Sequence, residues 1–382
     1  MLFSKKGRQL ALMTACLLAC QACSAETAAQ GTPEKAELTN YGSWQPVWLA
    51  KLQRLSRGGN VKFRIVQLGD SHTAGDYFTD RLRRRLQQQW GNGGIGWVYP
   101  NTVKGQRMAT VRYNGSGWNT ISSRKSHSDF SFGGIEARAD GGSVTLSAAD
   151  GSMDMQQISI FGKPVWSEQT LTVNGREIPA TQNGWQLLRT NASLPITLSS
   201  SMPWQIGFIN IERPGRGVTV SAMGINGAQL SQWSKWRPGM WEDLAQTKAD
   251  LIILAYGTNE AFSGNLDISS TEQTWRNYIR QIKNTLPNAG ILILGAPESL
   301  KTAYGSCGNR PVLLSEVQQM QQRVARDEKI MFWSWQDAMG GACSMKNWMA
   351  QGLAAKDGVH FSAQGYETAA DKLADSLIRF AQ

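Results

Sequence analysis

Residues 63–72 read FRIVQLGDSH, and this stretch indicates the fold class of the chain. Its apolar part, residues 63–68, predicts a short β-strand. A Gly-Asp-Ser turn follows, and from Phe78 to Leu86 apolar residues recur at every fourth position, which predicts a helix. The order of strand, tight turn and helix places Ser71 near a helix N-terminus, where backbone N–H groups favour an anion.

The same order of strand and helix returns after residue 217. Continuous apolar runs are typical of strands buried in a parallel sheet, and here they alternate with helical patterns. This alternation predicts an α/β fold with a doubly wound parallel sheet, in which ligands bind beyond the carboxyl ends of the strands. The predicted strands are residues 218–223, 251–256, 291–294 and a weaker 330–333, and the predicted helices are residues 271–286, 312–328 and 362–380.

The sequence pattern changes between these two parts of the chain. Short β-rich runs alternate there with Gly, Asn and Ser. Residues 173–176, Val-Asn-Gly-Arg, are a strong hairpin signal because Asn-Gly tolerates the positive φ values of a type I′ turn. We therefore predict an all-β insert, a sandwich or jelly roll, over residues 97–216. The α/β domain around it then comprises residues 40–96 and 217–382.

The composition fits a globular protein with a sizeable core, since 41% of the residues are hydrophobic. The formal net charge is +10. A basic surface suits an anionic polymer or a membrane, but scattered charges identify neither, and a solvated face is the simpler interpretation. We expect no nucleic-acid partner.

The N-terminus is typical of an export signal. Lys5, Lys6 and Arg8 precede an apolar run over residues 10–19, and small residues follow. This run is shorter than the ~20 apolar residues that span a bilayer. Two processing routes stay open. Residues 17–20, Leu-Leu-Ala-Cys, resemble a lipoprotein box that would leave Cys20 lipidated, whereas removal of residues 1–25 would release a soluble product.

The cysteines agree with export. Three of the five lie in the signal region, which leaves Cys307 and Cys343 in a compartment where disulfides persist. We predict that these two are bonded to each other. Neither has metal-ligand spacing and the chain has three histidines, so we expect no metal site and no cofactor.

Four short blocks, far apart in the sequence, hold the parts of a serine esterase: Gly-Asp-Ser at 69–71, a glycine at 227, Gly-Thr-Asn at 257–259 and Asp-Gly-Val-His at 357–360. A serine hydroxyl attacks poorly until a neighbour takes its proton, and the anion that forms needs preorganised donors. We therefore interpret Ser71 as the nucleophile, His360 as its base and Asp357 as the group that orients the base. The Ser71 and Gly227 N–H groups and the Asn259 side chain are the predicted oxyanion donors.

Other polar residues beside these blocks are given lesser roles. Asp70 is expected to hold the turn, and Glu260 is interpreted as a supporting or structural group. His72 adjoins the nucleophile and His127 lies in the insert, so both fit the role of base less well.

The order and spacing of the four blocks resemble those of the SGNH hydrolases, also called the GDSL family of lipases and esterases. Residues 224–227, Gly-Ile-Asn-Gly, offer two glycines, and the family pattern favours Gly227. The resemblance implies a flavodoxin-like, three-layer hydrolase that acts through a Ser-His-Asp triad.

Within this family, residues 69–76, 224–229 and 256–261 look closest to Gram-negative peptidoglycan O-acetylesterases. In these a β-rich, carbohydrate-module-like insert interrupts the hydrolase between its first and second blocks. The resemblance covers residues 60–380 and implies removal of O-acetyl groups from the C6 hydroxyl of N-acetylmuramoyl residues, which lets lytic transglycosylases act. It also implies O-acetylated glycan strands as partner and the periplasm as location, with or without an outer-membrane lipid anchor at Cys20.

Three alternatives stay open. A peptidoglycan O-acetyltransferase would share the acyl-enzyme and differ in whether water or a sugar hydroxyl resolves it. An esterase for another exported, acetylated polysaccharide would use the same triad. A non-catalytic wall-binding lipoprotein would have lost triad positions, and all of them are present here. Aromatic faces stack on sugars, but most tryptophans are core residues. The weak candidates for sugar stacking are Trp118, Trp166, Trp185 and Trp204.

Overall fold

The computed structural model describes residues 36–42, 47–166 and 169–382. The predicted export signal, with the Cys20 lipidation site and the alternative cleavage site, lies outside these residues. Within the described ranges, no helix is both long and apolar enough to cross a membrane.

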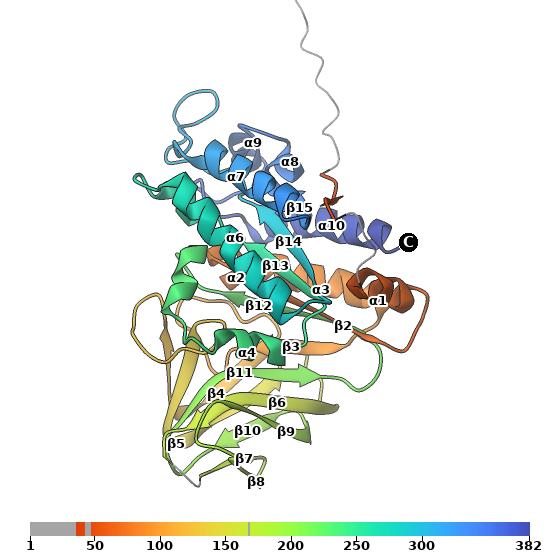
Figure 1. Cartoon of the computed structure of the whole chain (residues 1–382), viewed down its shortest axis with the longest axis vertical. Coiled ribbons are helices and arrows are strands. Elements are labelled where there is room, and N and C mark those ends of the chain that lie inside the picture. Colours follow the sequence, from red (N-terminus) through yellow and green to blue (C-terminus); the bar gives the residue numbers. More distant parts are fainter. Residues whose placement is uncertain (1–35, 43–46, 167–168) are drawn as a thin grey trace, which may run out of the picture. The chain divides into compact units, whose positions relative to one another are not determined.

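The central sheet contains β1 (Thr39–Asn40), β2 (Lys62–Gly69), β12 (Gly217–Gly224), β13 (Leu251–Ala255), β14 (Gly290–Gly295) and β15 (Met331–Ser334). The order across the sheet is β12, β2, β13, β14, β15, all parallel, and β1 pairs with β15 antiparallel at the edge (Figure 1). The first parallel strand, β2, therefore lies between the second and the third. This is the flavodoxin-like order, with a topological switch point between β2 and β13.

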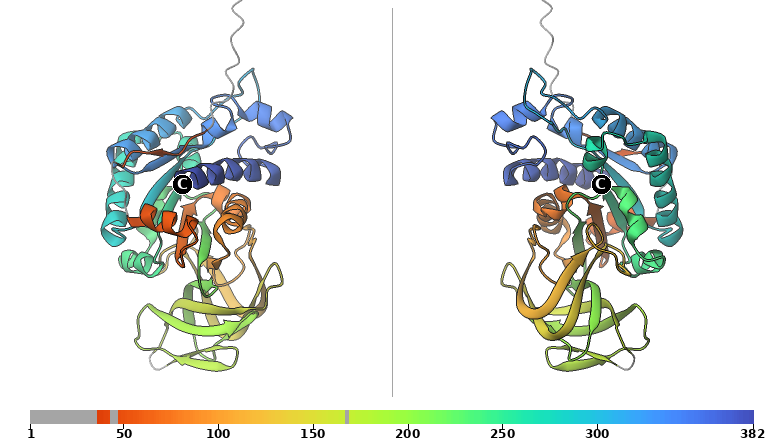
Figure 2. Two further views of the ribbon diagram at one scale, coloured as in Figure 1. Left: turned by 90° about the vertical axis from the view of Figure 1, so that its right-hand side faces the viewer. Right: turned by 90° about the vertical axis from the view of Figure 1, so that its left-hand side faces the viewer.

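Helices cover both faces of this sheet, which confirms the doubly wound fold (Figure 2). Side chains alternate along β13, so that Leu251 and Ile253 join one core while Ile252 and Leu254 join the other. Burying each such side chain contributes roughly 1.5–3 kcal/mol. The first core includes α1 (Val47–Ser56), α3 (Tyr77–Trp90) and α10 (Ala363–Phe380), and the second includes α4 (Met240–Gln246), α6 (Ile268–Thr285) and α7 (Leu314–Asp327).

The three helices predicted in the second half of the chain are confirmed as α6, α7 and α10. Side chains cap two of them: the Asp267 carboxylate accepts the Ser269 and Ser270 N–H groups, and the Ser362 hydroxyl accepts the Gly365 N–H. Short helices that the periodicity did not reveal are α2 (Ser71–Ala74), the 3₁₀ helix η1 (Leu230–Lys235), α5 (Thr258–Phe262), α8 (Trp335–Met339) and α9 (Met345–Ala350).

An antiparallel sheet of nine strands occupies the chain between α3 and β12, which confirms the all-β insert. The predicted hairpin is present: Val173 pairs with Arg176, and Asn174 and Gly175 have φ values of 49° and 79°. The strands are β3 (Gly94–Val98), β4 (Val111–Ser122), β5 (Ile135–Ala148), β6 (Met155–Pro164), β7 (Thr170–Val173), β8 (Arg176–Pro179), β9 (Gln186–Ser193), β10 (Ile196–Ser199) and β11 (Trp204–Glu212).

The insert shares a hydrophobic core with the parallel sheet. Phe132 and Phe208 of the insert pack in the same cluster as Leu68 and Leu254 of the sheet. The ring of Phe132 lies 5.6 Å from the ring of Trp236, edge to face. The insert is therefore held to the hydrolase part by hydrophobic packing as well as by its two covalent connections.

Candidate active site

Three of the predicted site residues lie just beyond the carboxyl ends of neighbouring strands. Ser71 follows β2, Gly227 follows β12 and Asn259 follows β13. Since these strands are adjacent and parallel, their ends meet at one edge of the sheet, beside the switch point. Ser71 opens the one-turn helix α2, and the long helix begins later, at Tyr77.

The fourth block completes the group from the loop before α10. Nε2 of His360 lies 2.9 Å from the Ser71 hydroxyl, and Nδ1 of His360 lies 2.7 Å from the Asp357 carboxylate. The structure therefore brings Ser71, His360 and Asp357 into one hydrogen-bonded chain across 289 residues of sequence. This is the geometry in which a carboxylate orients an imidazole and the imidazole takes a proton from a serine.

Asp357 is held as an anion. Partial burial opposes its charge, but hydrogen bonds from the His360 ring and from the Val359 and His360 N–H groups outweigh it and lower its pKa. One carboxylate oxygen accepts both N–H groups at 2.9 Å, which leaves the other for the imidazole. The backbone of residues 357–360 thus orients the Asp357 carboxylate, and the carboxylate in turn orients the His360 ring.

Two of the predicted oxyanion donors, Gly227 and Asn259, come from the loops after β12 and β13, the two neighbours of β2 in the sheet. Gly227 has a φ of 73°, and Nε of Arg124 donates to its carbonyl at 3.0 Å. In the part of the chain that the structure describes, the Gly227 N–H has no hydrogen-bond acceptor. The Asn259 amide donates to the Ala228 carbonyl at 2.9 Å and approaches the Asp70 carboxyl at 3.4 Å. The amide is therefore oriented by the Gly227 loop itself.

Glu260 joins the two loops that carry Gly227 and Asn259. Its carboxylate accepts the Leu230 N–H at 2.9 Å and the Gly257 N–H at 3.0 Å. Burial raises the pKa of Glu260 to about 7. Asp70 is equally buried, accepts the His72 N–H at 3.0 Å, and has its pKa raised by burial to about 8. Both positions agree with the supporting roles inferred from the sequence.

The other two histidines lie apart from this proton path. His72 is buried, its Nδ1 lies 2.9 Å from the Tyr366 hydroxyl, and burial lowers its pKa to about 3. It is therefore a neutral packing partner of the His360 ring, whose centroid is 5.5 Å away. His127 is exposed in the loop between β4 and β5.

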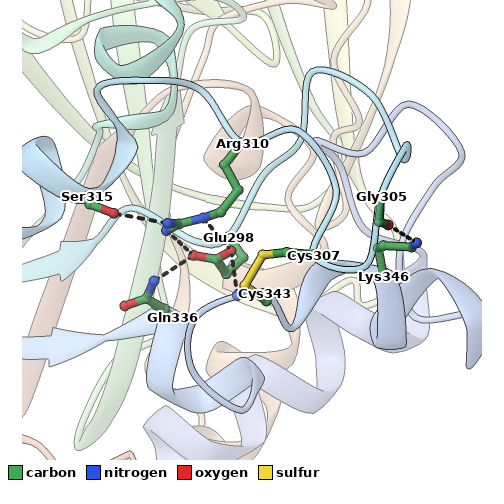
Figure 3. Close-up of a disulfide and its surroundings, with 8 residues drawn as sticks. All are labelled: Glu298, Gly305, Cys307, Arg310, Ser315, Gln336, Cys343 and Lys346. Carbon is green, nitrogen blue, oxygen red and sulfur yellow. Dashed lines mark hydrogen bonds and ion pairs between the residues drawn. A yellow bond between two sulfur atoms is a disulfide. The ribbon is translucent and has the colours of Figure 1, made fainter.

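The predicted disulfide is confirmed, since Cys307 is bonded to Cys343 (Figure 3). Beside it, the fully buried Glu298 accepts two hydrogen bonds from Arg310, at 3.0 and 2.6 Å, and one from the Cys343 N–H at 3.1 Å. We call residues 298–310 the tethered loop. Its ends are thus held by an ion pair and its tip by a covalent bond.

The tethered loop also contacts the block at residues 357–360. The Leu300 N–H donates to the Gly358 carbonyl at 2.7 Å. Gly358 has a φ of 70°, and a Cβ there would meet the Leu300 carbonyl oxygen at 3.1 Å. The backbone between Asp357 and His360 is therefore positioned by its contact with Leu300. No sequence pattern pointed to this support, because it depends on a contact between two loops.

Two further features of the described residues concern possible ligands. The described residues contain no group of His, Cys, Asp and Glu that could hold a metal ion. Among the tryptophans considered for sugar stacking, Trp166 is 58% exposed, whereas the other three are core residues. These three buried residues are Trp118, Trp185 and Trp204.

Comparisons with known proteins agree with this architecture. The profile described as "Peptidoglycan O-acetylesterase, N-terminal" matches residues 93–197, and that of the "GDSL-like Lipase/Acylhydrolase family" matches residues 207–368. A solved structure of a peptidoglycan O-acetylesterase is 62% identical with a TM-score of 0.88, over 90% of this chain and 99% of that chain.

More distant structural likenesses cover less of the chain. An acetyl xylan esterase is 15% identical with a TM-score of 0.34, over 42% of this chain and 81% of that one. A lipase/acylhydrolase from Enterococcus faecalis is 16% identical with a TM-score of 0.33, over 43% of this chain and 77% of that one. A search of curated proteins found no match.

Proposed function

The chain belongs to the peptidoglycan O-acetylesterases of the GDSL-like acylhydrolase family, and we propose that Ser71, His360 and Asp357 are its catalytic triad. The observation that carries this assignment is the pair of hydrogen bonds on the two ring nitrogens of His360, at 2.9 and 2.7 Å. A base placed in this way can take the Ser71 proton without any rearrangement of the side chains.

The proposed reaction has two halves. The Ser71 oxygen attacks the acetyl carbonyl while its proton passes to Nε2 of His360. The intermediate collapses, the bond to the sugar oxygen breaks, and His360 returns the proton to that oxygen. A water molecule then gives a proton to His360 and attacks the acetyl-serine. The bond to the Ser71 oxygen breaks, His360 returns the proton to that oxygen, and acetate leaves.

The oxyanion would be met by the Ser71 and Gly227 N–H groups and the Asn259 amide. Removing one donor of this kind typically costs ~2.7–4 kcal/mol in the transition state. The Glu260 carboxylate supports the assignment because it ties the Gly227 and Asn259 loops together. The donors are therefore fixed before the substrate arrives.

We propose that the acetyl group removed is that on the C6 hydroxyl of N-acetylmuramoyl residues. Its removal frees the hydroxyl that lytic transglycosylases need. In this proposal residues 40–96 and 217–382 form the catalytic domain and residues 97–216 hold the glycan. The chain acts outside the cytoplasm because its substrate lies there, and the basic and apolar N-terminal sequence supports the periplasm, with or without a lipid anchor at Cys20.

The test is acetate release from O-acetylated and de-O-acetylated peptidoglycan. Wild type should release acetate only from the acetylated wall, and Ser71→Ala should release none. His360→Gln should be equally inactive, whereas His127→Gln, an exposed control, should behave as wild type. Full activity of Ser71→Ala would refute the triad. Transfer of acetyl to a chitooligosaccharide in excess of acetate release would favour an O-acetyltransferase instead.

A further inference from the structure

A polar cleft of about 450 Å³ lies between the insert and the parallel sheet. Its floor includes Arg64 of β2 and Asn210 and Glu212 of β11. Its rim includes Arg176 of β8, Arg189 of β9 and Lys248, just before β13. Side chains from both parts of the molecule therefore form one hollow.

The rim of this cleft carries positive charge that the protein does not neutralise. On the floor, Arg64 donates two hydrogen bonds to Glu212, at 2.8 and 2.9 Å, so these two charges cancel. The three rim cations, in contrast, are exposed and form no ion pair with any described residue. Three positive charges around one hollow attract anions.

A second observation on the floor also points to a ligand. Asn210 is 7% exposed, and its amide donates to Glu212 at 3.0 Å. Its carbonyl oxygen is buried and accepts no hydrogen bond from the described residues. A buried acceptor without a donor is costly. A ligand that brings an N–H or O–H group to the floor would satisfy it.

The cleft lies far from the proposed nucleophile. Arg64 precedes Ser71 by seven residues of the β2 strand and turn, and a strand rises ~3.3 Å per residue, so roughly 20 Å separates them. The Arg64 end is the amino-terminal side of the sheet, whereas Ser71 lies beyond the carboxyl end. A group bound in the cleft is therefore not the acetyl group under attack.

We propose that this cleft binds the peptide stems of peptidoglycan, with their carboxylates at Arg176, Arg189 and Lys248 and an amide N–H at Asn210. The proposal rests on the membership in the peptidoglycan O-acetylesterases and is independent of the roles given to the triad. Glycan strands of this polymer carry neutral N-acetyl groups, and its peptides carry carboxylates and amides. The positive rim of the cleft matches the carboxylates of the peptides, and the unpaired carbonyl oxygen of Asn210 matches their amide N–H groups. The cleft holds the wall at a distance from the site where acetyl groups are removed.

The test is co-sedimentation with insoluble peptidoglycan. Soluble stem peptides and soluble peptide-free glycan strands, both released by an amidase, are added in turn as competitors. The cleft variant combines Arg176→Glu, Arg189→Glu and Lys248→Glu. The control variant, Arg57→Glu, Lys235→Glu and Lys329→Glu, makes the same charge change at exposed cations outside the cleft that have no ion pair among the described residues. Hydrolysis of p-nitrophenyl acetate checks that each variant is folded and active.

We expect wild type and the control variant to bind insoluble peptidoglycan, the stem peptides to displace them better than the peptide-free glycan does, and added salt to weaken this binding. The cleft variant should lose roughly tenfold in affinity for the intact polymer and keep its activity on p-nitrophenyl acetate. If the triple variant does not fold, Arg176→Gln with Arg189→Gln replaces it. Equal losses in both variants, or equal displacement by the stem peptides and by the peptide-free glycan, would overturn the proposal.

Discussion

At the scale of single residues, the site depends on how Asp357 is held. Its carboxylate accepts two backbone N–H groups and the His360 ring, and its pKa is lowered against the effect of burial. Because the backbone N–H groups stabilise its negative charge, Asp357 can orient the His360 ring before any substrate binds. The His360 ring is then aligned with the Ser71 hydroxyl, 2.9 Å from its Nε2.

Asp357→Asn should lower kcat on p-nitrophenyl acetate by up to about 10⁴-fold. The asparagine amide would donate to Nδ1 and hold His360 in the wrong tautomer, so that Nε2 no longer accepts the Ser71 proton. Asp150→Asn, an exposed control in the turn between β5 and β6, should leave kcat unchanged. A kcat for Asp357→Asn within about tenfold of wild type would contradict the role given to this carboxylate.

Glu260→Gln should flatten the dependence of stability on pH. Burial raises the pKa of Glu260 from 4.5 to about 7, so the folded protein binds this proton more tightly than the unfolded chain. Its contribution to stability is full below pH 4.5 and is lost as the pH rises to about 7. At ~1.4 kcal/mol per pH unit, the loss is at most about 3 kcal/mol.

Urea unfolding across this pH range measures the effect. The unfolding free energy of wild type should fall as the pH rises, while that of Glu260→Gln should fall less. Glu242→Gln, on the exposed side of α4, is the matched control and should follow wild type. Identical slopes for wild type and Glu260→Gln would show that this proton is not linked to folding.

At the scale of elements, the tethered loop supports the block at residues 357–360. The Cys307–Cys343 bond and the Glu298–Arg310 ion pair hold the loop, and Leu300 donates to Gly358 at 2.7 Å. Asp357 and His360 flank this contact on a loop of their own. Their position therefore depends on an element that supplies no catalytic group.

Replacing both cysteines, Cys307→Ser with Cys343→Ser, should lower the unfolding free energy by about 2–5 kcal/mol. Well below the melting temperature it should also lower kcat roughly tenfold, with KM little changed, because His360 shifts relative to Ser71. Lys346→Ala removes only the outer contact with the Gly305 carbonyl and is the control. Lower stability with unchanged kcat would mean that the disulfide only stabilises the fold.

At the scale of the whole molecule, the insert and the hydrolase share one core. Phe132 of the insert lies 6.4 Å from the ring of Phe208 and 5.6 Å from that of Trp236, which follows η1 in the hydrolase part. Removing the insert would expose the apolar side chains of this cluster. The two parts are therefore expected to unfold together.

Phe132→Ala should cost about 3–5 kcal/mol and lower the temperature of a single calorimetric transition. The exposed Trp166→Ala, also in the insert, should change the stability by no more than about 0.5 kcal/mol. Two separate transitions, of which Phe132→Ala moves only one, would show that the insert is an independent domain.

Most of the fold could be predicted from local sequence patterns. The apolar runs at residues 63–68 and 251–256 identified buried parallel strands because both of their faces are covered. The Asn174-Gly175 turn identified a hairpin because few other residues accept its positive φ values. Short helices such as α8 and α9 were not predicted, because fewer than two turns give no clear periodicity.

The sequence by itself determined the candidate site residues and the strand that precedes most of them, since chemistry and strand ends are local properties. Only the tertiary structure decided that β2 lies between β12 and β13, which brings Ser71, Gly227 and Asn259 to one edge. It also decided that Leu300 contacts the loop of His360. It decided as well that the insert and the parallel sheet together form a basic cleft. These features are contacts between segments distant in the chain, and no local pattern encodes a distance between two loops.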